Sequence, residues 1–150
     1  MSARGTDIVD RVIRALQKVT PDNGFHTDAG TRVVRGRPEN LKLEAGDLPM
    51  ISVSTVTSSN ESAKRTAVRK AREIEIVGMV DASGADYEPA IDELDEDIAL
   101  ALAPLMSIDE MPDATEIALG GGDYRHPEGG SKIAGVIHMI TVSYALTQQP

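Results

Sequence analysis

The sequence contains no cysteine and no tryptophan, and only one Phe and three Tyr among its 150 residues. Without cysteine, neither a disulfide scaffold nor a thiolate metal site can form. With so few aromatic rings, the core must be built from Ile, Val, Leu, Met and Ala. The apolar fraction of 41% is ordinary for a globular protein. We therefore expect a single domain, residues 1–150, with an aliphatic core.

Long apolar runs are also missing. No stretch of the sequence approaches the roughly 20 apolar residues that a helix needs to cross a bilayer. The N-terminus has no cationic segment followed by an apolar one, so we expect neither a membrane span nor a secretory signal. The lack of cysteine fits a reducing compartment such as the cytosol.

Cations are scarce in the second half of the chain. Residues 73–150 hold only two Lys or Arg against 16 acids, a net charge of −14, whereas residues 1–72 hold 13 cations against 8 acids, a net charge of +5. This division favours either neutralisation within one fold or complementary surfaces on neighbouring copies. Two segments stand out, a basic run over 64–72 and an acidic run over 92–97.

Apolar periodicity predicts the main elements. Helical spacing indicates one amphipathic helix over 6–19 and another over 87–105, kinked or ended by Pro104. Alternation of apolar and polar residues predicts strands over 31–35, 48–57, 66–80, 116–119 and 132–146. The expected fold is α+β, a mixed β-sheet of about four to five strands with two main helices packed on it.

Three polar stretches are expected outside the core. Residues 57–62 are small and polar and read as a loop or hairpin tip, and residues 64–72 should project from the core as a charged hairpin arm. The Gly-rich residues 120–130 should form a loop. On the second helix, the acids over 92–97 should share the solvent-facing side.

Candidate catalytic or metal-binding groups are few and isolated. No two histidines stand at helical ligand spacing, and the expected place of His138 on an apolar strand face favours a satisfied or edge residue. His26 and His126 lie in loops near Asp28 and Asp123, which leaves a weak metal site as an open alternative.

Two catalytic or nucleotide-binding motifs are also missing. The Gly120–Asp123 segment lacks the GK[ST] ending and the helix start of a phosphate loop. No serine lies in a G-x-S-x-G motif. We expect no enzymatic activity, no cofactor and no metal.

The basic run permits more than one interpretation. Direct nucleic-acid binding is disfavoured because the chain is acidic and no aromatic residue lies within ten positions of the run. The run is either a solvated arm or an arm that docks on the acidic helix of an adjacent copy. The docking alternative predicts a subunit interface formed by Lys64, Arg65, Arg69, Lys70, Arg72, Asp92, Glu93, Asp95 and Glu96.

The order of these elements resembles a known family. An N-terminal amphipathic helix is followed by the strand LPMISV, a polar and then basic hairpin, and the strand REIEIVGMV. An acidic helix, a Gly-rich segment and the strand VIHMITVSYAL complete the chain. Over nearly its whole length this layout resembles the tail terminator proteins of long-tailed bacteriophages, the minor tail protein U type.

The resemblance implies a structural virion protein. Members close into a hexameric ring on the finished tail tube, stop its polymerisation and join it to the head-side connector, while DNA passes through the lumen without specific binding. It thus implies assembly in the host cytoplasm and a place at the head-proximal end of the tail, with the tube protein and the connector as partners. A head–tail connector or stopper of the neck is the alternative, and a small ligand-binding or enzymatic domain is a further one.

Overall fold

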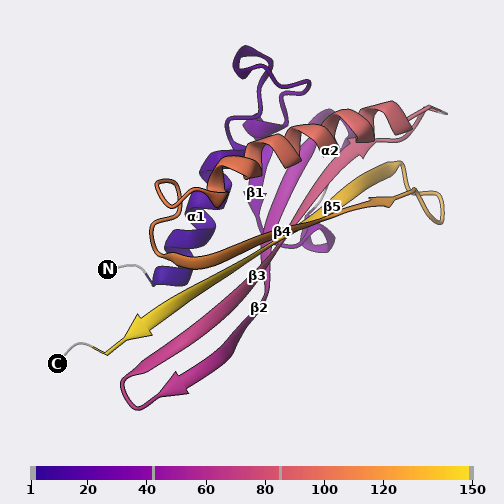
Figure 1. Cartoon of the computed structure of the whole chain (residues 1–150). Coiled ribbons are helices and arrows are strands. Elements are labelled where there is room, and N and C mark those ends of the chain that lie inside the picture. The colour runs from indigo at the N-terminus through magenta and orange to yellow at the C-terminus, as the bar shows by residue number, and fades with distance from the viewer. Residues whose placement is uncertain (1–2, 42, 85, 149–150) are drawn as a thin grey trace.

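The computed structural model describes residues 3–41, 43–84 and 86–148 and contains one five-stranded sheet with two helices on one face (Figure 1). The helices are α1 (Arg4–Leu16) and α2 (Glu88–Leu102), and the strands are β1 (Val33–Arg35), β2 (Met50–Lys64), β3 (Ala67–Asp81), β4 (Ala114–Arg125) and β5 (Ile133–Thr147). The predicted α+β fold, with its mixed sheet, two main helices and protruding hairpin, is confirmed.

The sheet is centred on β3. Its strand order is β1-β2-β3-β5-β4, in which only β1 and β2 are parallel. β3 pairs with β5 without interruption from Ala67↔Thr147 to Asp81↔Ile133. At the edges, β1 covers only the residues Ile51–Val53 of β2, and β4 borders β5. The C-terminal strand is therefore internal, as its run of apolar residues predicts.

α1 ends earlier than predicted. Its apolar stripe is buried against the sheet, but the helix stops at Leu16 instead of continuing to Val19. After Gln17 the Lys18 and Val19 amides bond only three residues back, to the Ala15 and Leu16 carbonyls, and the Val19 carbonyl accepts a hydrogen bond from the Gly30 amide at 2.8 Å. Short 3-10 turns then follow at Pro21–Asn23, Ala29–Arg32, Pro38–Asn40 and Ala45–Asp47.

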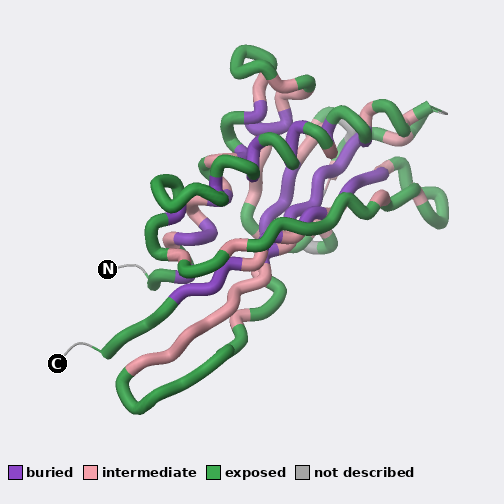
Figure 2. The backbone as a smooth tube through the Cα atoms, in the orientation of Figure 1, coloured by how far each residue is buried: buried purple, intermediate pink, exposed green. Residues whose placement is uncertain are grey.

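α2 covers the middle of the sheet and approaches it closely at Gly78. A Cβ added at Gly78 of β3 would lie 2.8 Å from Ile98 Cδ1 and 2.8 Å from Leu94 Cδ2. Only glycine permits this approach, and Leu94 and Ile98 are fully buried. Figure 2 shows buried residues along the sheet side of α2. Beyond Leu102 the chain tightens into a 3-10 turn, Ala103–Met106, which contains Pro104. The predicted end at Pro104 is thus close to the observed one.

The predicted loop over 57–62 is wrong, and the predicted loop over 120–130 is wrong over 120–125 but is confirmed over 126–130. Residues 57–62 belong to β2, and the hairpin turns only at Arg65–Thr66. Residues Gly120–Arg125 belong to β4, where Gly121 and Gly122 have φ angles of +111° and +93° beside a β-bulge. In both places, pairing with a distant strand supplies the backbone hydrogen bonds, so small polar residues and glycines are held in extended strands.

The β2–β3 hairpin extends well past the helices, as expected for residues 64–72. We call residues 57–72 the arm. Figure 1 shows the arm pointing away from the body, with the end of β5 running alongside it. Most of the arm is exposed or half-buried (Figure 2).

Within the described residues, no helix has both the length and the apolar composition needed to cross a membrane.

The contact at Gly78 gives a stability prediction. We expect Gly78→Ala to lower the free energy of unfolding by about 1–3 kcal/mol, because the new methyl group overpacks Leu94 and Ile98. The matched control is Gly120→Ala, a strand glycine whose added Cβ would meet nothing within 4 Å. Urea unfolding of both variants measures the difference, and equal stability of the two would contradict the proposed packing constraint.

Candidate functional site

The predicted basic residues divide between the tip and the base of the arm. Lys64 and Arg65 flank the turn and are exposed. Closer to the body, Lys70 Nζ donates to Asn60 Oδ1 at 2.8 Å, and Arg72 Nη1 donates to Thr55 Oγ1 at 2.9 Å. Only the tip cations are therefore directed wholly toward solvent.

Arg69 links three strands on the sheet face that lies opposite the helices. Its guanidinium lies 3.2 Å from Glu61 of β2 and 3.3 Å from Glu116 of β4. The Ser143 hydroxyl of β5 donates to Glu61 Oε1 at 2.6 Å. This network connects the arm to β4 across the sheet. It also pairs the Arg69 charge with carboxylates of the same chain.

The N-terminus of α1 anchors the base of the arm. The Arg72 guanidinium covers Gly5, where an added Cβ would lie 2.4 Å from Nη2. Arg4 Nη1 donates to the Ala145 carbonyl of β5 at 2.8 Å. The arm is therefore held by helix and sheet together and is not a free hairpin.

The predicted acidic residues of α2 also divide into two groups. Asp92 accepts a hydrogen bond from the Tyr124 hydroxyl of β4, and Asp95 Oδ1 lies 2.7 Å from His138 Nε2 of β5. Glu93 is exposed, and Glu96 is exposed beside His26 at 3.9 Å. Thus Glu93 and Glu96 point outward, while Asp92 and Asp95 fasten α2 to the sheet.

His138 is a satisfied, nearly buried residue, as its place on an apolar strand face predicts. Its residue exposure is 8%, and its ring contacts Asp95. His126 lies 2.8 Å from the Tyr87 hydroxyl. Within the described ranges, no group of three or more metal-binding side chains comes together.

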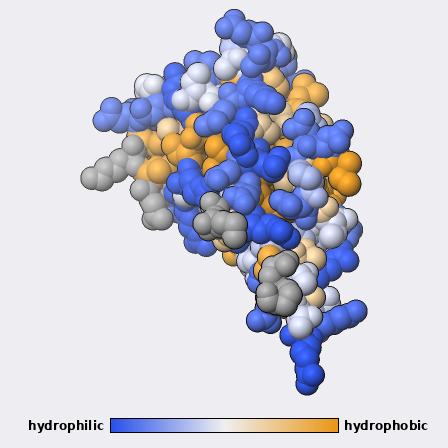
Figure 3. Space-filling view, turned by 90° about the vertical axis from the view of Figure 1, so that its left-hand side faces the viewer, coloured by the Kyte–Doolittle hydropathy of each residue, from blue (hydrophilic) through white to orange (hydrophobic). Residues whose placement is uncertain are grey.

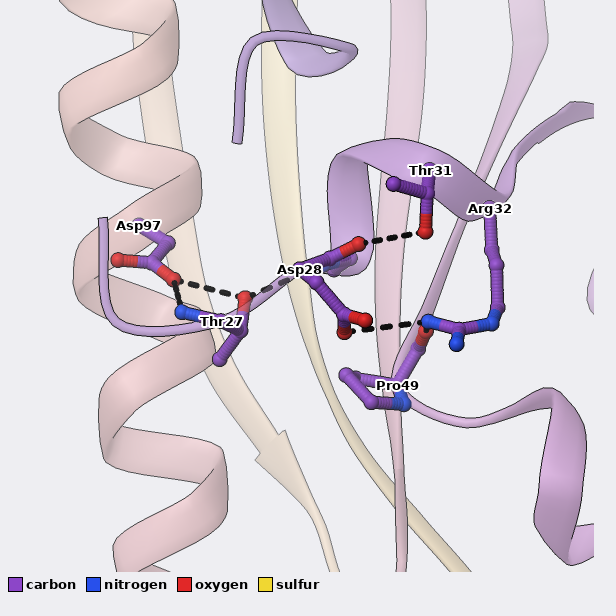
Figure 4. A network of polar contacts seen from close by, with 7 residues as sticks. Thr27, Asp28, Thr31, Arg32, Pro49 and Asp97 are labelled. Carbon is purple, nitrogen blue, oxygen red and sulfur yellow. Dashed lines mark hydrogen bonds and ion pairs between the residues drawn. The ribbon is translucent and has the colours of Figure 1, made fainter. Parts of the chain in front are cut away.

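Asp97 contradicts the prediction that all acids over 92–97 face solvent. It is fully buried, and its carboxylate accepts a hydrogen bond from the His26 amide at 2.9 Å. It also accepts hydrogen bonds from the Thr27 amide at 2.8 Å and the Thr27 hydroxyl at 2.8 Å (Figure 4). Position 97 lies on the same side of α2 as the buried residues Leu94 and Ala101, so its spacing in the sequence already indicated burial. Its hydrogen-bond donors lie about 70 residues away, where periodicity gives no information.

The same network fixes the loop that follows α1. Arg32 lies 3.1 Å from the Asp28 carboxylate and donates to the Pro49 carbonyl at 3.4 Å (Figure 4). A shallow groove opens next to it, between this loop, the end of β3 and α2. His26, Asp28 and Glu93 line the groove, but Asp28 is already paired with Arg32.

An exposed apolar surface was missed by the sequence analysis. Three large apolar side chains that do not belong to the buried side of α2 are more than half exposed: Leu100 at 63%, Met106 at 51% and Ile108 at 74%. Met106 and Ile108 lie beside the start of β4, together with Ala114 and Ile117. Figure 3 shows apolar side chains at the surface of the body, in contrast to the hydrophilic lower end of the molecule.

The Asp97 network predicts a large loss of stability on truncation. Asp97→Ala leaves two amides without their acceptor, so we expect the free energy of unfolding to fall by about 2–4 kcal/mol. Asp97→Asn retains one acceptor oxygen and should lose less. Glu93→Ala, on the exposed side of the same helix, is the control and should change stability by less than about 0.5 kcal/mol. Equal effects at 93 and 97, measured by urea unfolding, would refute the role of the network.

The hydrogen bond between Asp92 and Tyr124 predicts that the Tyr124 hydroxyl loses its proton at a higher pH than an ordinary tyrosine. The hydrogen bond to Asp92 is the main cause that raises the pKa of Tyr124, with burial and the charge of Asp95 adding to it. The resulting stabilisation is complete below the unfolded tyrosine pKa of about 10 and is lost as pH rises above it. Asp92→Asn should lower the pKa of Tyr124, measured by NMR titration of labelled tyrosine. An unchanged Tyr124 titration in this variant would exclude the bond.

Two solved structures are distantly similar to the chain. No family model matches the chain, and no curated protein matches it. A chain from the virion of a native gene transfer agent particle is 14% identical, with a TM-score of 0.47 over 78% of this chain and 81% of that chain. A second solved chain is 14% identical, with a TM-score of 0.30 over 94% of this chain and 96% of that chain. Both TM-scores are below 0.5, so neither similarity decides the function.

Proposed function

We propose that the chain is a non-enzymatic structural subunit of a phage-type virion. Copies of it form a ring, of six in the family it resembles, at the head-proximal end of the tail. The ring stops polymerisation of the tail tube and joins the tube to the head-side connector. The sequence resemblance motivates this role, and one observation of the structure supports it most: the exposed cations of the arm tip and the exposed acids of α2 lie on separate parts of the molecule.

The distance between these two groups matters because it keeps the tip cations and the outward acids of α2 from pairing within one copy. The arm tip, with Lys64 and Arg65, points away from the body, while α2 carries Glu93 and Glu96 across the body (Figure 1). A closed ring requires that one patch meet a different patch on the next copy. A cationic tip and an acidic helix face on the same chain provide such a pair.

The nine predicted interface residues take different parts in this proposal. Lys64, Arg65, Glu93 and Glu96 form the contacts between copies. Arg69, Lys70 and Arg72 hold the arm in position, and Asp92 and Asp95 hold α2. The five anchoring residues therefore contribute indirectly, because they hold the four contact residues in fixed positions.

Exposed ion pairs orient the copies more than they bind them. Each is worth about 0–1 kcal/mol, so the pairs set register, and buried apolar surface must supply affinity. The exposed Met106 and Ile108 are available for that purpose. The overall charge of −9 also suits a channel for DNA, because phosphate affinity comes mainly from Lys and Arg.

Charge reversal at the tip tests the proposal. Lys64→Glu with Arg65→Glu replaces attraction by repulsion, and we expect assembly to weaken roughly tenfold, from two lost pairs of about 0.7 kcal/mol each. Native mass spectrometry measures the rings, and electron microscopy measures the length of tubes polymerised with the tail tube protein. Tubes should become overlong with the variant.

Rescue and control variants make this test specific. Glu93→Lys with Glu96→Lys should restore assembly of the tip variant. Lys18→Glu with Arg37→Glu makes the same change of net charge at exposed positions of the body and should assemble normally. Full assembly of the tip variant would contradict the proposed ion pairs between copies. Failure of the protein to bind tube ends would contradict the terminator role. Binding to the head-side connector alone would favour the role of a neck connector or stopper.

A further inference from the structure

The sheet has two long edges whose backbone groups point outward without partners. β4 forms one edge, and from Thr115 to Arg125 it pairs only with β5. The other edge is β2 from Ser54 to Lys64, because β1 pairs only with Ile51–Val53. Within the described residues, no further backbone hydrogen bond reaches either of these segments.

The middle of each edge has few of the side chains that usually prevent association. Natural edge strands are protected by Lys, Pro, charged residues, β-bulges or short length. On these two edges Lys64, Asp123 and Arg125 lie only at the ends. Here residues 54–63 contain one charge, Glu61, and residues 115–122 also contain one, Glu116. Both segments are otherwise made of Ser, Thr, Ala, Gly, Asn and aliphatic residues. Each also has one large exposed apolar side chain, Val56 at 43% and Leu119 at 39%.

Bulges confine the regular part of each edge. β2 is irregular between Thr55 and Thr57 and between Asn60 and Ser62, and β4 is irregular between Ala114 and Glu116 and between Gly121 and Asp123. Regular strand therefore remains over 57–60 in β2 and over 116–121 in β4. These two segments also lie at the same level of the sheet, because Thr57, Glu73, Thr141 and Ala118 form one continuous cross-strand row.

The polarity of the strands suits pairing between copies. β2 runs toward the arm tip, and β4, antiparallel to β5, runs away from it. Copies related by a ring axis share one orientation, so β4 of one copy meets β2 of the next in antiparallel fashion. This is the slightly more stable of the two ways in which strands can pair.

We propose that the β4 edge of each copy, over 116–121, pairs with the β2 edge of the next copy, over 57–60. This inference rests on the proposed ring and identifies its main interface. The pairing is head-to-tail, as a ring requires, and ring closure leaves no free edge. The neighbouring edge also covers the apolar surface of Met106 and Ile108, which lies beside the start of β4.

A second copy fits these edges better than an unrelated peptide. The two free segments belong to the same chain, lie at the same level and have the polarity that cyclic symmetry demands. Pairing of β4 with a foreign strand would leave the β2 edge open in every copy. Pairing between copies removes both edges at once.

Disulfide trapping tests the pairing directly, since the chain has no cysteine of its own. The double variant Thr57→Cys with Ala118→Cys places one thiol on each edge, at the two ends of the same cross-strand row. Residues opposite each other on paired strands have Cα atoms about 4.5–5.5 Å apart, a separation that a disulfide can bridge. A second double variant, Ser59→Cys with Ala118→Cys, tests pairing in a register shifted by two residues.

Oxidation of the full-length protein should give a ladder of covalent multimers beyond the dimer on non-reducing gels. Each single-cysteine variant can form no more than a dimer. The matched control is Ser58→Cys with Ala118→Cys, which puts the two thiols on opposite faces of the sheet because Ser58 pairs with Arg72 on the helix side. This control should give no ladder.

The outcomes separate this inference from the proposed function. Rings seen by native mass spectrometry without a ladder from either double variant, free or on tubes, would overturn the edge pairing and leave the terminator role standing. A ladder from a protein that does not limit tube length would support the edge pairing and remove the terminator role. Absence of both rings and ladders would overturn the pairing as well as the ring.

Discussion

The close contact between α2 and the sheet at Gly78 sets the geometry of the rest of the molecule. Without a side chain at Gly78, Leu94 and Ile98 reach the backbone of β3. At that distance the helix brings Asp95 to His138 and Asp97 to the loop after α1. A helix held even one side-chain layer farther away would lose these polar contacts, so a packing constraint decides which acids are internal and which remain exposed.

The arm depends on a different set of contacts. A two-stranded hairpin alone is marginally stable in water, and this one gains a third strand from the end of β5. Arg72 over Gly5 and the Glu61–Arg69–Glu116 network connect it to α1 and to β4. Most of its positive charge is thereby used within the chain. The division of charge between the two halves of the sequence thus serves the fold first and leaves only a few charges for assembly.

The proposed interfaces divide the work of assembly between different forces. The charges at the arm tip and on α2 act over a longer range and orient neighbouring copies. Edge pairing and burial of Met106 and Ile108 act at contact and provide directional hydrogen bonds and apolar area. Both are head-to-tail contacts, so each is compatible with a closed ring and neither with a symmetric dimer. In the proposed edge register, however, the arm tip lies roughly 30 Å along the strands from the part of α2 that holds the neighbour's Glu93 and Glu96. The tip can therefore meet those acids only while the copies approach each other, before the edges pair.

The predicted elements and the predicted site differ in how much the sequence determined. Helical and strand periodicities placed α1, α2, β3 and β5 correctly, because a regular apolar pattern records which side of an element is buried. The protruding arm could likewise be predicted from its lack of apolar residues. The satisfied role of His138 followed from the apolar strand around it.

Only the tertiary structure decided the rest. Residues 57–62 and 120–125 look like loops along the chain, yet each is a strand because a distant strand supplies its hydrogen bonds. Asp97 looks solvent-facing, yet donors about 70 residues away satisfy it in the interior. Local pattern therefore determined which segments are helices and strands and where the charges lie along the chain. Contacts between remote residues determined which of those charges are internal and which edges remain open, because hydrogen-bond and ion-pair partners are set by proximity in space and not in sequence.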